Sequence, residues 1–159
     1  MKTILILITT ILFVSCGSET RTVPEKSKEL ASKLSDENTL VGNWIAQPGY
    51  QNDSIKLIHV DSLYGKMNNI MRFQSNYELD MFDIDGDKNL YTCGNTLRYN
   101  DLFSNWKLIK EEGLLYLDIF GGSVESSFHT KKAYKIIEVR KDTISIVLFK
   151  TLTDERKKH

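Results

Sequence analysis

The chain contains few of the residues that cross-link small exported domains or interrupt strands. Its 159 residues include two cysteines, Cys16 and Cys93, and two prolines, at positions 24 and 48. Two cysteines allow at most one disulfide, so no disulfide framework is possible. The neighbours of Cys93 include no general base, which predicts a buried thiol and not a nucleophile. Neither proline interrupts a segment with β pattern.

The chain also lacks an excess of charge of one sign. It has 21 basic and 21 acidic residues, and this balance excludes nucleic acid as a partner on electrostatic grounds. The cluster Arg156-Lys157-Lys158 near the C-terminus is too short to change that. We interpret residues 153–159 as a basic tail that is frayed and solvated.

Known catalytic and zinc motifs are missing. His59, His129 and His159 lie far apart, without the spacing of zinc ligands. There is no Gly-x-Ser-x-Gly elbow and no glycine loop for phosphate. Asp118 lies within an apolar segment, and no second group is evident to act with it. The sequence therefore predicts a protein that is not an enzyme and needs no cofactor.

One acidic segment resembles the start of a calcium loop. Asp83, Asp85 and Asp87 alternate, as carboxylates that converge on one cation can do. The EF-hand pattern needs glycine at position six and glutamate at position twelve, where this chain has Lys88 and Gly94. A solvated turn around Asp85-Gly86 is the stronger interpretation, and calcium stays the alternative.

The N-terminus carries the clearest signal. Lys2 precedes an apolar run over residues 3–14, which is shorter than the about 20 residues that a membrane-spanning helix needs. A short apolar run behind a positive charge is typical of a secretory signal peptide. Ordinary secretion and an uncleaved anchor are the alternatives to the interpretation that follows.

The segment Phe13-Val14-Ser15-Cys16 resembles the lipobox of bacterial lipoproteins. The resemblance implies a signal peptide over residues 1–15 and lipidation of Cys16. Gly17, where an aspartate would direct retention in the inner membrane, implies the outer membrane. Which face of that membrane carries the protein stays open. Residues 16–38 then form a polar tether, in which Leu30 and Leu34 lie on one face of a short helix that either docks or stays disordered.

From residue 39 onward the pattern is that of β-structure. Apolar segments of strand length recur between turn-forming clusters, at residues 40–46, 54–60, 69–74, 77–84, 89–93, 106–110, 114–120, 133–140 and 143–150. Tight turns at Lys141-Asp142 and before Gly113 predict hairpins. We therefore expect an all-β domain over residues 39–152 that forms a small antiparallel up-and-down β-barrel, with a sandwich as the alternative.

Gly42-Asn43-Trp44 resembles the opening motif of the lipocalins. The resemblance implies a lipocalin-like barrel whose base is plugged by Trp44, with Arg140 packed over the indole ring. These residues would be structural and would not contact a ligand. The Thr-Asp-Tyr motif of that family is absent from this chain.

Two functional hypotheses follow. In the first, the barrel binds a small apolar or amphipathic ligand, with Phe73 and Tyr77 among its lining residues. In the second, the domain is an envelope protein-interaction module, either an accessory, an inhibitor or an immunity-type lipoprotein. Phe128 and His129, in a long loop predicted over residues 121–132, are candidate contacts for either partner. Val147 and Phe149 supply apolar surface for the second hypothesis.

Overall fold

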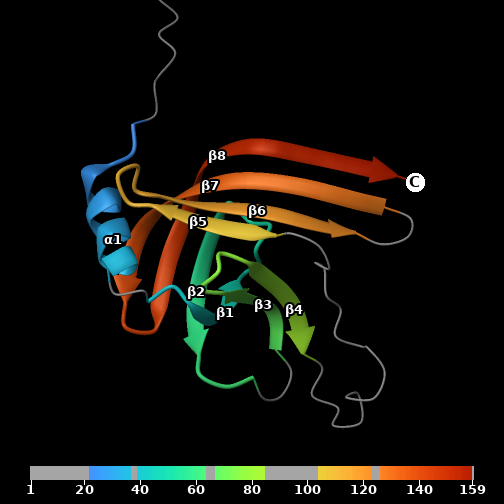
Figure 1. Ribbon diagram of the computed structural model, residues 1–159, viewed down its shortest axis with the longest axis horizontal. Coiled ribbons are helices and arrows are strands. Elements are labelled where there is room, and N and C mark those ends of the chain that lie inside the picture. Colours follow the sequence, from blue (N-terminus) through green and yellow to red (C-terminus); the bar gives the residue numbers. More distant parts are fainter. Residues whose placement is uncertain (1–21, 37–38, 64–66, 85–103, 123–125, 159) are drawn as a thin grey trace, which may run out of the picture.

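The computed structural model describes residues 22–36, 39–63, 67–84, 104–122 and 126–158. One helix precedes eight strands, which form a single antiparallel sheet that curves into a nearly closed barrel (Figure 1). The all-β prediction is therefore confirmed. The elements are α1 Glu25–Asp36, β1 Gly42–Gln47, β2 Ser54–Val60, β3 Met67–Phe73, β4 Leu79–Ile84, β5 Asn105–Ile109, β6 Leu114–Gly122, β7 Ser126–Arg140 and β8 Thr143–Lys158.

The strands do not follow one another around the barrel in chain order. Their spatial order is β4-β3-β1-β2-β8-β7-β6-β5. The two hairpins predicted from tight turns, β5–β6 and β7–β8, are present. However, β1 lies between β2 and β3, and β2 lies beside β8. The simple up-and-down succession expected from consecutive hairpins is thus interrupted at two places.

A short bridge joins the two ends of this sheet. Glu78, just before β4, pairs with Asn105 at the start of β5. Leu79 N donates to Ser104 O at 2.9 Å, and Trp106 N donates to Tyr77 O at 3.0 Å. This bridge brings the edge strands β4 and β5 together at their beginnings and nearly closes the barrel.

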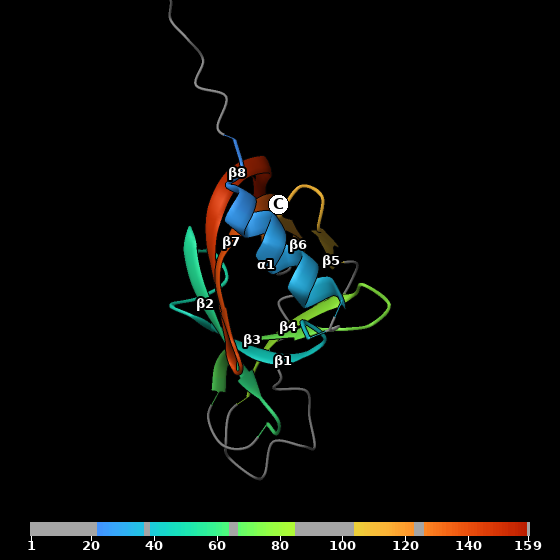
Figure 2. The same ribbon diagram turned by 90° about the vertical axis from the view of Figure 1, so that its left-hand side faces the viewer.

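Helix α1 covers one end of the barrel (Figure 2). Ala31 and Leu34 on its inner face are buried in the core, as the spacing of its apolar residues predicts for a docked amphipathic helix. Ser27 is also buried: its Oγ donates to Gly113 O at 2.7 Å and accepts from Ile136 N at 2.9 Å. Among the described residues, no helix is long and apolar enough to cross a membrane.

The strands β6, β7 and β8 are longer than their apolar segments predict. β6 continues to Gly122 and β7 begins at Ser126, so most of the long loop predicted over residues 121–132 is strand. β8 continues to Lys158, so the frayed tail predicted from residue 153 is also wrong. Both polar segments pair with β7 or β6 residue by residue. Cross-strand pairing has outweighed their weak intrinsic preference for β-structure.

Candidate functional site

The long strands form one wall of a groove, named here the β6–β8 groove. Its volume is about 310 Å³, and it opens to solvent. It is lined by Leu117 and Ile119 of β6, by Ser127, Phe128, Thr130 and Lys132 of β7, by Asp154, Arg156 and Lys157 of β8, and by Tyr50 and Gln51 of the β1–β2 connection.

Register explains why these side chains meet. Leu117 pairs with Lys132 and Ile119 pairs with Thr130, while Phe128 pairs with Arg156. Alternate residues of neighbouring strands point to the same face of a sheet. The apolar side chains are therefore continuous with the barrel interior, where Leu117 and Ile119 are buried.

The groove combines an apolar floor with a basic rim. Lys132, Arg156 and Lys157 line it, against the single carboxylate of Asp154. Lys132 is only 15% exposed, and its Nζ donates to Gln51 O at 2.9 Å and lies 3.7 Å from Asp53 Oδ1. Arg156 is largely exposed, with Nε 3.6 Å from Asp154 Oδ1. An apolar surface beside an excess of positive charge suits a ligand with an apolar chain and an anionic group.

The loop beside the groove is fixed by Tyr134. This side chain is fully buried, and its hydroxyl donates to Asn52 O at 3.3 Å. Burial, and secondarily the Asp53 carboxylate, raise the pKa of Tyr134 above its ordinary value of 10.0. The neutral phenol thus acts as a donor that holds the β1–β2 connection against β7.

The predicted barrel-base residues are only partly brought together. Trp44 is buried as expected, and its Nε1 donates to Leu40 O at 2.8 Å. Gly42 has φ +143°, and a Cβ there would lie 3.1 Å from His59 Nε2. Arg140 does not pack over the indole: it is 71% exposed and pairs with Glu138. His59 instead contacts Trp44 edge-on, with ring centroids 5.0 Å apart.

Phe73 and Tyr77 do not line the β6–β8 groove. Phe73 is fully buried, with its ring centroid 5.6 Å from that of Trp106, so it fills the core. Tyr77 is 60% exposed, and its ring centroid lies 5.3 Å from that of Trp106.

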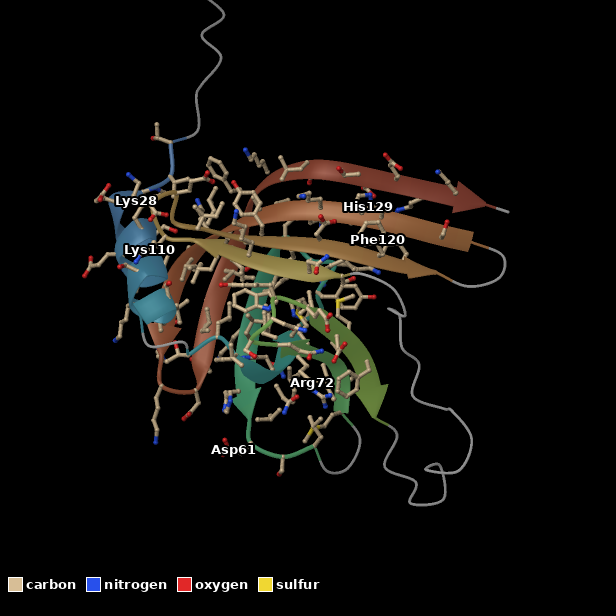
Figure 3. The ribbon with its side chains drawn as sticks, in the orientation of Figure 1. Lys28, Asp61, Arg72, Lys110, Phe120 and His129 are labelled. Carbon is tan, nitrogen blue, oxygen red and sulfur yellow. The ribbon has the colours of Figure 1, made fainter. Side chains whose placement is uncertain are left out.

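Phe128 and His129 point to opposite faces of β7. Phe128 lines the β6–β8 groove. His129 lies on the outer face, stacked on Phe120 with ring centroids 4.0 Å apart (Figure 3). Its Nε2 is 2.7 Å from Asp118 Oδ1, and Lys131 Nζ is 2.9 Å from Asp118 Oδ2. Asp118, which had no evident partner in the sequence, is therefore held between two basic groups.

Several predicted residues fall outside the described part of the chain. Cys16, Cys93, Asp85 and Asp87 lie there, and Asp83 belongs to β4 without a described side chain. Among the described residues, no group of three or more histidine, cysteine or acidic side chains could hold a metal ion.

Sequence reasoning missed the basic side of the groove and Tyr50. The residues on the groove-facing side of β7 and β8 lie in segments that look like a loop and a tail. Phe128, Thr130 and Lys132 alternate along the sequence, which is the pattern of residues on one face of a strand. This alternation identifies them as groove-facing only when the register of their pairing with β6 is known.

Of the three residues predicted for the barrel base, Gly42 and Trp44 lie together, while Arg140 is not their partner. The strand order also departs from an up-and-down succession. Comparisons with protein-family models, with curated proteins and with solved structures find no match to this chain.

Proposed function

We propose that this protein is a lipid-anchored lipoprotein of the bacterial outer membrane whose barrel domain binds a small amphipathic ligand in the β6–β8 groove. The observation that carries the proposal is the groove itself, with a floor of Leu117, Ile119 and Phe128 and a basic rim. Its volume of about 310 Å³ lies at the lower end of the range of about 300–1,000 Å³ that small-molecule sites occupy.

The chemistry of the lining defines the ligand class. An alkyl chain would lie against Phe128, the half-buried apolar side chain of the lining, above the buried Ile119 and Leu117. A carboxylate or phosphate head would lie near Arg156 or Lys157 on the rim, because Lys132 Nζ already lies 3.7 Å from Asp53 Oδ1 and donates to Gln51 O. A single-chain anionic amphiphile fits this arrangement better than an uncharged one.

The N-terminal segment supports the location. The lipobox-like Phe13-Val14-Ser15-Cys16 implies acyl chains on Cys16. One acyl chain binds a membrane only reversibly, whereas two or more hold a protein there. A ligand with an alkyl chain is abundant at such a surface.

The test is a fluorescence titration of the full-length chain with cis-parinaric acid, a fluorescent fatty acid. We expect saturable binding that Phe128→Ala weakens about tenfold or more, because burial of one aromatic side chain contributes about 1.5–3 kcal/mol. Arg156→Glu should weaken binding by a smaller factor, about fivefold, because solvent screens the attraction between an anionic head and the largely exposed Arg156.

Arg140→Glu provides the matched control, because it makes the same charge change at an exposed arginine near the far end of β7. It should leave the Kd unchanged. Absence of saturable binding, or equal losses from Arg140→Glu and Arg156→Glu, would contradict the proposal. A methyl ester of the same fatty acid should bind more weakly than the free acid if the basic rim is used.

A further inference from the structure

A second groove, named here the β5-edge groove, runs along the outermost strand. All five residues of β5 line it, together with Tyr77, Tyr116, Asp118 and Lys131. Its volume of about 690 Å³ is larger than that of the β6–β8 groove. Its lining is separate from the residues of the proposed small-ligand site.

The free side of β5 presents unpaired backbone groups to this groove. β5 is the last strand in the sheet, paired with β6 on its other side. Because backbone groups alternate in direction along a strand, Leu108 N–H and C=O point to the same side as Trp106 N–H. Trp106 N donates to Tyr77 O, which lies on the side of β5 away from β6. Leu108 N–H and C=O therefore point to that outer edge. Among the described residues, no strand pairs with this edge beyond the bridge at Asn105.

The segment before β4 already pairs with the first residues of this edge. At its first residues the edge accepts an extended antiparallel segment, which pairs Glu78 with Asn105. Continued in the same register, Ser75 would lie opposite Leu108. Ser75 does not lie opposite Leu108, because the chain turns back toward β3 at this point. In this turn Tyr77 N donates to Gln74 O, and Gln74 N donates to Glu78 O. The added strand thus stops after one bridge, and the remainder of the edge is left for another segment.

Tyr77 marks the point where the intrinsic pairing stops. Its φ is +68°, a left-handed conformation that is strained for a bulky residue. Strain of about 1–3 kcal/mol persists only where surrounding contacts enforce it, and it clusters at binding sites. Here it leaves a 60% exposed phenol ring against Trp106 at the groove.

The charges of the groove define the occupant. Lys107 is exposed on β5 itself, whereas Lys131 lies on β7, beyond β6, and its Nζ is 2.9 Å from Asp118 Oδ2. Two copies of β5 paired about a symmetric centre would place Lys107 directly opposite Lys107, which is unfavourable. A strand with acidic side chains on that face, and apolar side chains toward Trp106 and Leu108, is complementary.

We propose that the free edge of β5 binds an extended, acidic and apolar peptide segment of another protein, which adds to the sheet as an antiparallel strand. The added strand would form hydrogen bonds with Leu108 N–H and C=O. The acidic side chain opposite Lys107 would lie near that ammonium group on the outer face. This activity is independent of ligand binding in the β6–β8 groove.

Fluorescence anisotropy with a labelled peptide tests the proposal on the full-length chain. The probe is a capped seven-residue peptide of alternating valine and glutamate. We expect saturable binding, with Lys107→Glu raising the Kd at least fivefold. Lys56→Glu, the same charge change at an exposed lysine of β2, should have no effect. Leu108→Pro should abolish binding, because it removes the N–H that faces the groove but no hydrogen bond to β6.

A second peptide, with the same side chains but N-methylated at each valine, separates strand addition from simple adhesion. It should not bind, since it cannot donate along one edge. Equal binding of the methylated peptide, equal effects of Lys107→Glu and Lys56→Glu, or no binding of the first peptide would overturn the proposal. So would a concentration-dependent dimer in sedimentation velocity that Leu108→Pro abolishes, since the occupant would then be a second copy.

Discussion

Tyr134 illustrates how much one side chain contributes to the geometry of this protein. It heads the largest fully buried side chains of the described residues, and its hydroxyl reaches the backbone of the β1–β2 connection. A phenol in this position must be neutral, because burial opposes its charged form. The burial of Tyr134 in the core and its hydrogen bond to the β1–β2 connection therefore both require the protonated phenol.

We expect this proton to appear in the pH dependence of stability. The folded-state pKa of Tyr134 is raised above 10.0, its ordinary value, by burial first and by Asp53 second. The unfolded chain then releases the proton at lower pH than the folded chain. The stabilisation is complete below pH 10 and is lost as the pH rises through the unfolded and then the folded pKa.

Tyr134→Phe should therefore lower the free energy of unfolding at pH 7 by about 0.5–1.5 kcal/mol, the value of one lost hydrogen bond. Above pH 10 this difference should shrink and then reverse. Urea unfolding of both chains at a series of pH values measures it, and comparison at each pH cancels the titration of other groups. A difference that does not change between pH 7 and pH 11 would contradict the assignment.

At the same scale, the sequence identifies Trp44 as a buried residue but not its neighbour. Burial follows from the apolar strand in which the indole lies. The partner depends on register, because Trp44 pairs with His59 across β1 and β2. Arg140 lies at the β7–β8 turn and forms an ion pair with Glu138 instead. A cross-strand contact of this kind is fixed by the turn and the core together, which a single strand does not reveal.

Among the elements, α1 has the most specific attachment. Its Ser27 links two distant parts of the sheet, the β5–β6 turn at Gly113 and the backbone of Ile136 in β7. Gly113 has φ +67°, and a Cβ there would lie 2.7 Å from Lys28 N. Close approach of the helix to the turn thus requires both a glycine and a small hydroxyl side chain.

Ser27→Ala should destabilise the chain by about 2 kcal/mol or more, because Gly113 O and Ile136 N both lose their partner and each buried polar group left unpaired costs about 1–3 kcal/mol. The amide protons of α1 should also exchange faster with solvent. Urea unfolding and hydrogen exchange measure the two effects. Ser54→Ala, at an exposed serine, is the control and should change stability by less than about 0.5 kcal/mol. A loss no greater than that of the control would contradict the role assigned to Ser27.

The lengths of β7 and β8 could not be predicted from their own residues. Ser126, Ser127, Thr130 and Lys131 are polar and resemble a loop, yet each pairs with a residue of β8. Residues 144–148 can be predicted as a strand from the sequence, because apolar residues recur at every second position, and two of these, Ile144 and Ile146, are buried. Where a strand projects beyond the core, its apolar signal fades while its backbone pairing continues.

For the whole molecule, the sequence predicts the class of fold and the local hairpins but not the order of strands. Tight turns identify β5–β6 and β7–β8 as neighbours. The contacts of β1 with β3 and of β2 with β8 carry no turn signal, since distant segments form them. The apolar half of the β6–β8 groove was partly predicted through Phe128, whereas its basic rim required the completed sheet.

Membrane attachment is a property of the whole chain that the N-terminal sequence predicts. The full-length chain should incorporate a palmitate analogue and sediment with the membrane fraction of the cells that make it. Cys16→Ser should lose the label and leave that fraction, because Cys16 is the proposed acceptor. Cys93→Ser, the matched control at the other cysteine, should behave as wild type. Label retained by Cys16→Ser would show that acylation does not occur at the lipobox.

The extension of β8 has a consequence for aggregation. β2 pairs with β8 as far as Val147, and Leu148 N donates to Asp53 O, so the residues from Phe149 to Lys158 have one side without a partner strand in the described structure. Long exposed edges recruit other chains into intermolecular sheets, and charges of both signs along the edge prevent this. Lys150, Asp154, Glu155, Arg156 and Lys157 supply such charges. These charges of both signs are therefore expected to act as gatekeepers that oppose edge-to-edge pairing between copies of the protein.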